Sequence, residues 1–188
     1  MLLANMDTTD TLARRLGTTT HVSGLLCRAR ALGLGSPRAL QTLAVQRGCR
    51  HYLQGDEPGT PLVSEEQLSN EELAIALLSV ALPYDPESVR CGAAMLSAEG
   101  NLPERLAWLA TLERSVVPVR HVADAGIRYE PTNTFWCELL SKLPATAAPK
   151  PGVLPHSTRF VAMTGFTRSG PGQVTQWLRP AHNRQVAA

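Results

Sequence analysis

Histidine and cysteine are the residue types in this 188-residue chain best suited to catalysis or metal binding. The only close pair, Cys49 and His51, lacks the spacing of a zinc finger or ribbon. The sequence contains no GxSxG, HExxH, P-loop or GxGxxG motif. We therefore predict no catalytic residue, no metal and no cofactor. We expect the scattered cysteines to be small buried hydrophobic residues: Cys27, Cys49, Cys91 and Cys137.

Arginines near the start of the chain offer a different chemistry, the neutralisation of phosphates or of an acidic partner. The segment LARRLGTTTHVSGLL, residues 12–26, has the Ala, Gly and Val typical of a DNA-reading helix-turn-helix. Its Gly17-to-Val22 interval is one residue short, however, and only eleven residues precede Leu12. The predicted contacts with nucleic acid or an acidic partner are Arg14, Arg15, Arg28, Arg30, Arg38 and Arg47.

Charge is strongly segregated along the chain. Residues 11–55 carry +7 and no acid, residues 56–113 carry −9, and residues 114–188 carry +6. Sixteen of the eighteen basic residues are arginine, which favours planar, bidentate pairing, although a GC-rich genome would produce the same bias. The pattern predicts either segments that attract one another in the fold or basic ends that meet an acidic partner.

Length and composition fit one domain with a single core, since 44% of the residues are hydrophobic. The apolar stretches are far shorter than the roughly 20 residues that cross a bilayer. The first residues, MLLANMDTTD, have no basic start and carry two acids where a signal peptide stays apolar. We expect a cytoplasmic protein that does not contact membranes.

Three short helices are predicted in an Arg-rich segment, residues 1–50. The first spans 8–16 and ends at Gly17, and the second buries a stripe from Val22 to Leu32. The third begins at a Ser36 cap followed by Pro37. Residues 49–63 contain two glycines and two prolines without a sustained period, which predicts a linker.

A helical core is predicted over residues 64–143. Ser64 and Ser69 both begin capping-box patterns, and the second precedes a helix that is apolar on most of its circumference. Further helices are expected over 85–100, over 103–114 with its leucines and Trp108 buried, over 116–127, and from an Asn133 cap to 143.

Residues 71–130 contain a two-helix unit twice, because Val89-Arg90 and Val119-Arg120 lie thirty residues apart, as do Ala93 and Ala123. The run from Asp85 to Gly100 resembles the second helix of a HEAT-type repeat. That resemblance implies that Asp85 caps the helix, that Val89 and Ala93 pack into the core, and that Arg90 pairs with an acid of an adjacent unit.

The second copy keeps Val119, Arg120 and Ala123 but has valine where the capping Asp would fall. An unrelated helical bundle is the alternative. HEAT-like DNA glycosylases suggest a further possibility, a groove lined by Arg120 and Asp124 with the three tryptophans, Trp108, Trp136 and Trp177. A helical ion pair between Arg120 and Asp124 is the simpler interpretation.

The end of the chain changes period. Residues 144–157 contain four prolines and predict an extended linker. Residues 158–180 form two alternating runs around a Gly-Pro turn, a pattern typical of a β-hairpin, which should pack on the helices or pair with a partner.

The predicted fold is mainly α, built from antiparallel helical hairpins in one compact domain, with a HEAT-like, α-solenoid-like centre and a small C-terminal β-hairpin. Stacked helical pairs present extended surfaces. A non-enzymatic protein-binding or scaffold module, with a protein partner or a second copy of the chain, is therefore the leading hypothesis. Nucleic-acid binding through the N-terminal arginines is the alternative, and an enzyme of unknown type comes third.

Overall fold

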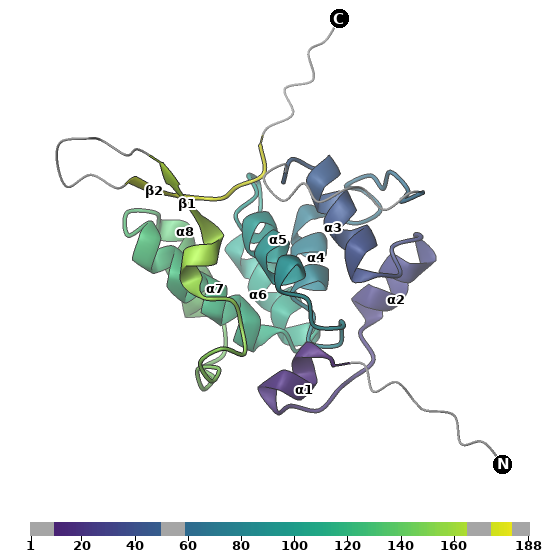
Figure 1. Cartoon of the computed structure of the whole chain (residues 1–188), viewed down its shortest axis with the longest axis horizontal. Coiled ribbons are helices and arrows are strands. Elements are labelled where there is room, and N and C mark those ends of the chain that lie inside the picture. Colours follow the sequence, from purple (N-terminus) through teal and green to yellow (C-terminus); the bar gives the residue numbers. More distant parts are fainter. Residues whose placement is uncertain (1–9, 50–58, 165–173, 182–188) are drawn as a thin grey trace, which may run out of the picture.

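The computed structural model describes residues 10–49, 59–164 and 174–181. Within these ranges the chain is mainly helical and ends in a small two-stranded antiparallel sheet (Figure 1). No helix in the described ranges is both long and apolar enough to span a membrane. The elements are α1 (Leu12–Leu16), α2 (Gly24–Ala31), α3 (Pro37–Gln46), α4 (Asn70–Leu77), α5 (Pro86–Leu96), α6 (Pro103–Leu112), α7 (Val116–Tyr129), α8 (Thr134–Lys142), the 3₁₀ helix η2 (Ser157–Phe160), β1 (Val161–Thr164) and β2 (Val174–Trp177).

Side-chain caps start four of the eight α-helices in the described ranges where the sequence predicts them. Ser36, Asp85 and Asn133 each accept a hydrogen bond from a backbone amide of the first turn, and Ser69 forms a complete capping box with Glu72. Ser23 caps α2 in the same way. These bonds satisfy amides that have no partner inside the helix.

Two rows of helices make up the body of the molecule. α2, α4, α6 and α8 contact one another in that order, and α3, α5 and α7 form a second row against them. α4 and α6 start side by side, since the Leu102 amide donates to Glu71 at 3.4 Å and Arg105 pairs with both Glu71 and Glu72. α2 runs in the opposite direction, because its start lies beside Glu113 and its middle beside Glu72.

α4 is the centre of the core, as its apolar circumference predicts. Its residues Leu73 to Leu77 are at most 1% exposed. α5 approaches it closely at Gly92, where a β-carbon would lie 2.7 Å from Leu78 Cγ. One hydrophobic cluster connects α4 with residues as distant in sequence as Leu12 and Trp177.

The repeat positions carry out most, though not all, of the expected roles. Val89, Ala93, Val119 and Ala123 are buried. Asp85 caps α5 through the Glu87 amide.

Two arginines of the repeats depart from expectation. Arg90 bonds both oxygens of Glu87, at 2.6 and 2.8 Å, within its own helix rather than an acid of an adjacent unit, because three residues place the two side chains on one face. Arg120 donates to the carbonyl oxygens of Leu143 and Pro144, both at 3.2 Å.

Three further expectations about the helices are wrong. Val22 precedes the Ser23 cap instead of belonging to the α2 stripe, and it is exposed. Ser64 begins a turn in which the Gln67 side chain accepts a hydrogen bond from the Ser64 amide, and no helix begins before Asn70. Trp108 and Leu112 are exposed on α6, because Leu106, Leu109 and Ala110 form its buried face.

The C-terminal hairpin forms and packs on the helices. Val161 pairs with Trp177 and Thr164 with Val174, in antiparallel register. Contacts with α7 and η2 hold the sheet. The predicted Gly-Pro turn lies outside the described residues.

Candidate functional site

The N-terminal arginines differ in what they contact. Arg15 lies 3.5 Å from Asp10, donates to the Gly152 carbonyl at 3.3 Å and stacks 3.9 Å over the Tyr84 ring. Arg14 and Arg30 are exposed, and Arg38 is half-buried. The structure thus does not gather the six predicted contacts on one helix face.

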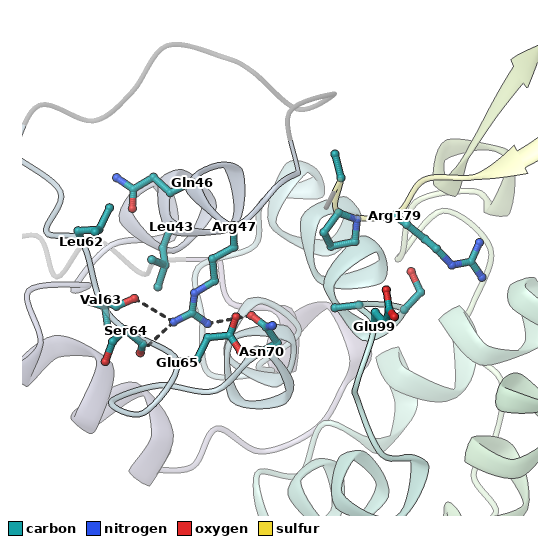
Figure 2. A pocket seen from close by; sticks show the side chains of 14 residues that line it. Leu43, Gln46, Arg47, Leu62, Val63, Ser64, Glu65, Asn70, Glu99 and Arg179 are labelled. Atoms are coloured by element: carbon teal, nitrogen blue, oxygen red, sulfur yellow. Dashed lines mark hydrogen bonds between the residues drawn. The ribbon is translucent and has the colours of Figure 1, made fainter. Parts of the chain in front are cut away.

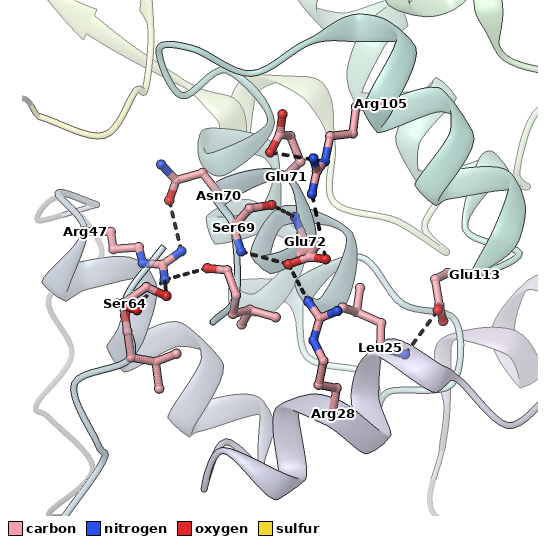
Figure 3. Close-up of polar contacts among 12 residues, drawn as sticks. Leu25, Arg28, Arg47, Ser64, Ser69, Asn70, Glu71, Glu72, Arg105 and Glu113 are labelled. Carbon is pink, nitrogen blue, oxygen red and sulfur yellow. Dashed lines mark hydrogen bonds and ion pairs between the residues drawn. The ribbon is translucent and has the colours of Figure 1, made fainter. Parts of the chain in front are cut away.

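Arg28 belongs to an ion-pair network that joins three helices (Figure 3). It reaches across from α2 to Glu72 on α4, and Arg105 of α6 approaches Glu72 at 4.0 Å and Glu71 at 3.7 Å. Burial by itself would raise the pKa of Glu72, but hydrogen bonds from Arg28 and the Ser69 amide, with the charges of Arg28 and Arg105, hold that pKa below its usual range. The first basic block and the acidic centre therefore meet here inside the fold.

Arg47 fixes the chain that leads into α4. Its guanidinium donates to the carbonyl oxygens of Val63, Ser64 and Leu68 at 3.1, 3.1 and 2.7 Å, and to the Asn70 side chain at 3.0 Å. Burial lowers its pKa, although nearby carboxylates oppose the shift. Because backbone carbonyls already use these donors, Arg47 has a structural task.

Glu113 anchors the beginning of α2 and was missed by the sequence analysis. Its carboxylate, 6% exposed, accepts hydrogen bonds from the Ser23 hydroxyl at 2.5 Å and the Leu25 amide at 3.1 Å. A carboxylate at a helix N-terminus is electrostatically favourable. The ninety residues between Glu113 and Ser23 leave no local pattern that could reveal the contact.

A cavity of about 850 Å³ lies beside Arg47 (Figure 2). Figure 2 shows Arg47 and Asn70 on one side of it and Glu99 and Arg179 on the other. Among the lining residues the two basic groups are balanced by two acids, Glu65 and Glu99, and Arg47 and Arg179 already bond partners within the chain. Among the described residues, the lining contains serine hydroxyls but no histidine or cysteine.

The buried cysteines are poor nucleophiles. Burial raises the pKa of Cys49 to about 12, and burial also raises the pKa of Cys91. The prediction that the cysteines are buried holds for these two, whereas Cys27 and Cys137 are exposed.

Two of the three tryptophans close the C-terminal end of the molecule in an arrangement we term the aromatic clasp. Trp177 of β2 packs on Trp136 of α8 with ring centroids 4.7 Å apart, and on Phe160 at 5.8 Å. Glu130 accepts from the Trp136 indole at 2.7 Å and from Arg179 at 2.6 and 2.5 Å. Burial would raise the pKa of Glu130, but these hydrogen bonds and the charge of Arg179 hold it below its usual range.

The third tryptophan lies on what we term the α6 face, the solvent side of α6 from residue 104 to 112. Trp108 and Leu112, one turn apart, are 62% and 59% exposed. At 100° per residue, Trp108 is at the centre of this side, Arg105 is on the α4 flank and Glu104 is on the α8 flank. Glu104 pairs with Lys142 of α8 at 2.8 Å.

The residues that a tryptophan-lined groove would bring together are divided between the clasp and the α6 face. Trp136 and Trp177 are buried against each other, whereas Trp108 is exposed. In α6, apolar residues occupy both sides of the helix, and only the solvent side lacks a neighbour within the described residues. Trp108 and Leu112, at i, i+4 spacing opposite Leu106 and Ala110, mark a second apolar side in the sequence, but this spacing does not show which side is exposed.

The ionisable residues within the described ranges include no group of three or more that could hold a metal ion. The α6 face, with its two uncovered apolar side chains between ion pairs, is accordingly the strongest candidate site. No protein-family model, curated protein or solved structure matches this chain.

Proposed function

We propose that this protein is a non-enzymatic protein-binding or scaffold module and that it binds its partner through the α6 face. The exposure of Trp108 beside Leu112 is the observation that carries this proposal. Tryptophan is the residue most enriched among the dominant contacts of protein interfaces, and leaving its large apolar surface in water has no structural benefit. A partner that covers the two side chains removes that surface from water.

The architecture supports the same function. We propose that the two rows of helices form a short HEAT-like stack, in which α4 with α5 and α6 with α7 are the repeated units. Such stacks present the outer face of a row as an extended surface for other proteins. α2 departs from this scheme because it runs against α4, so it caps the row rather than extending it.

Site-specific photocrosslinking tests the proposal. A photoreactive phenylalanine analogue at Leu112, in the cells that make the protein, should form one reproducible adduct whose partner mass spectrometry identifies. The same analogue at Arg159, exposed on η2, is the matched control. The purified partner should then bind the wild-type protein and lose affinity by about tenfold or more when Trp108 becomes Glu. Equal adducts from both positions, or binding unchanged by Trp108→Glu, would overturn the proposal.

Nucleic-acid binding remains the alternative prediction. Arg15, Arg28 and Arg47 have partners within the chain, which favours protein binding, whereas Arg14 and Arg30 are exposed. A salt titration with a random DNA duplex tests the alternative. Phosphate contacts would give a steep slope that Arg14→Glu with Arg30→Glu reduces, and no detectable binding at low salt would exclude it.

A further inference from the structure

The charges around the α6 face point to the chemistry of its partner. We infer that the partner is an amphipathic helix with an apolar stripe flanked by acidic side chains. This inference rests on the proposed function, because it assumes that the α6 face is where a protein binds.

On the α4 side of this face, the basic side chains are more exposed than the acids that they pair with. Arg28 and Arg105 have 47% and 51% of their side chains exposed, against 13% for their shared partner Glu72. Glu71 is likewise 11% exposed and Glu113 is buried. The ion-pair network of Arg28 and Arg105 with Glu71 and Glu72 is thus neutral overall but presents guanidinium groups to an approaching molecule (Figure 3).

The two ends of α6 differ in charge. Arg114 follows the end of the helix and is exposed. Glu104 is an exposed acid on this face, and Lys142 lies 2.8 Å from it. The surface beside Trp108 therefore has a positive rim along its α4 side and at the C-terminal end of α6, which attracts acidic partners and repels basic ones.

The apolar part of the face has the shape that one helix can cover. Trp108 and Leu112 lie about 6 Å apart along α6, at 1.5 Å per residue. A partner helix with apolar residues at i, i+3 or i+4 and i+7, and acids beside them, matches both this apolar pair and the positive rim.

The positive rim also argues against a second copy of the chain as the occupant. A two-fold symmetric contact centred on Trp108 would bring Arg105 and Arg114 of one copy close to the same residues of the other. Like charges facing each other at an interface are unfavourable. An acidic helix avoids this repulsion and neutralises the rim.

Tryptophan fluorescence of the full chain can test this directly, because Trp136 and Trp177 are buried and Trp108 is exposed. The probes are three helix-stabilised peptides of about 18 residues with the same leucine stripe and with Glu, Gln or Lys at the other positions. The Leu/Glu peptide should shift the emission to the blue and protect Trp108 from acrylamide. Its affinity should exceed that of the Leu/Lys peptide by about tenfold or more and fall between about 50 and 300 mM salt.

Charge-reversal variants identify the surface responsible. Arg105→Glu with Arg114→Glu should remove the preference for the Leu/Glu peptide, whereas Arg159→Glu, the matched control on η2, should leave it unchanged. Trp108→Phe should bind the peptide without the fluorescence change, which is followed instead by a label on the peptide.

The results that overturn the inference are distinct from those that overturn the proposed function. If the Leu/Lys peptide binds as tightly as the Leu/Glu peptide and Trp108→Glu abolishes both, the acidic partner is wrong while protein binding at the α6 face stands. If Trp108 becomes protected at high protein concentration without peptide, the occupant is a second copy. If no peptide protects Trp108, a helical partner is wrong, and photocrosslinking at Leu112 alone decides the proposed function.

Discussion

The aromatic clasp and the α6 face contain the same residue types, but the clasp buries its tryptophans whereas the α6 face exposes its tryptophan. Each places tryptophan close to an Arg–Glu pair. In the clasp, the chain after η2 returns and covers Trp136 with Trp177, while Arg179 bonds Glu130 across forty-nine residues. On the α6 face nothing within the described residues covers Trp108, and Arg105 pairs with α4 beside it.

This difference shows that the chain is able to bury tryptophan where burial serves stability. Two of the three side chains are at most 2% exposed. The fold therefore has places in which aromatic side chains are buried, and a lack of such places does not explain the exposure of Trp108. We propose that the clasp serves stability and the α6 face serves recognition, and substitutions on each side can break that assignment.

Removal of a tryptophan should give the largest contrast. Trp136→Ala deletes a fully buried side chain and the Trp177 contact, so we expect the free energy of unfolding to fall by about 3–5 kcal/mol. Trp108→Ala should change it by about 0.5 kcal/mol or less, because the side chain has few contacts to lose. Urea unfolding followed by circular dichroism measures both values. Similar losses for the two variants would refute the division between clasp and α6 face.

Adding a single methyl group should give the same contrast with a smaller effect on stability. A β-carbon at Gly126 of α7 would lie 2.2 Å from the Trp136 ring, so Gly126→Ala should overpack the clasp and cost about 1–3 kcal/mol. Gly24→Ala on α2 is the matched control, since its β-carbon would lie 3.9 Å from Glu113. That substitution should be neutral or stabilise by up to about 1 kcal/mol through helix propensity. Thermal unfolding compares the two variants, and a neutral Gly126→Ala would show that the clasp is loosely packed.

Acid should weaken the clasp through Glu130. Its pKa is lowered in the folded state, so its stabilising contribution is complete above the unfolded value of about 4.3 and is lost as pH falls through the folded pKa. Glu130→Gln should therefore cost about 1 kcal/mol at pH 7, since the pair with Arg179 is partly exposed, and progressively less below about pH 4.

The pH dependence of stability can also be measured with Glu72, which lies beside the α6 face. Its pKa is also lowered, so Glu72→Gln should show the same direction of pH dependence. Urea unfolding at several pH values measures both variants against the wild type. A difference between wild type and either variant that grows in acid would contradict the lowered pKa.

Local features of the fold were predictable from the sequence because their causes are local. Ser36, Ser69, Asp85 and Asn133 cap helices through bonds that span two or three residues. The central place of α4 follows from its apolar circumference, and the hairpin follows from alternating residues.

The candidate site was not predictable for a physical reason. α6 has apolar residues on both sides, and helical period alone does not say which side meets the core. The leucine spacing of 106, 109 and 112 suggested one buried stripe, but packing against α4 and α8 selects Leu106, Leu109 and Ala110. The partner of Arg90 was also not predictable from the repeat pattern, because the nearby Glu87 competes with any more distant acid.

The smallest effect should come from the ion pair that borders the α6 face on its α8 side. Glu104 and Lys142 are 2.8 Å apart with 72% and 37% of their side chains exposed. Water and salt screen such a pair, so Glu104→Gln should change the free energy of unfolding by about 0.5 kcal/mol or less. A double-mutant cycle with Lys142→Gln measures the coupling. A coupling above about 1 kcal/mol would show that this border stabilises the fold as the clasp does, and the α6 face could then no longer be assigned to recognition alone.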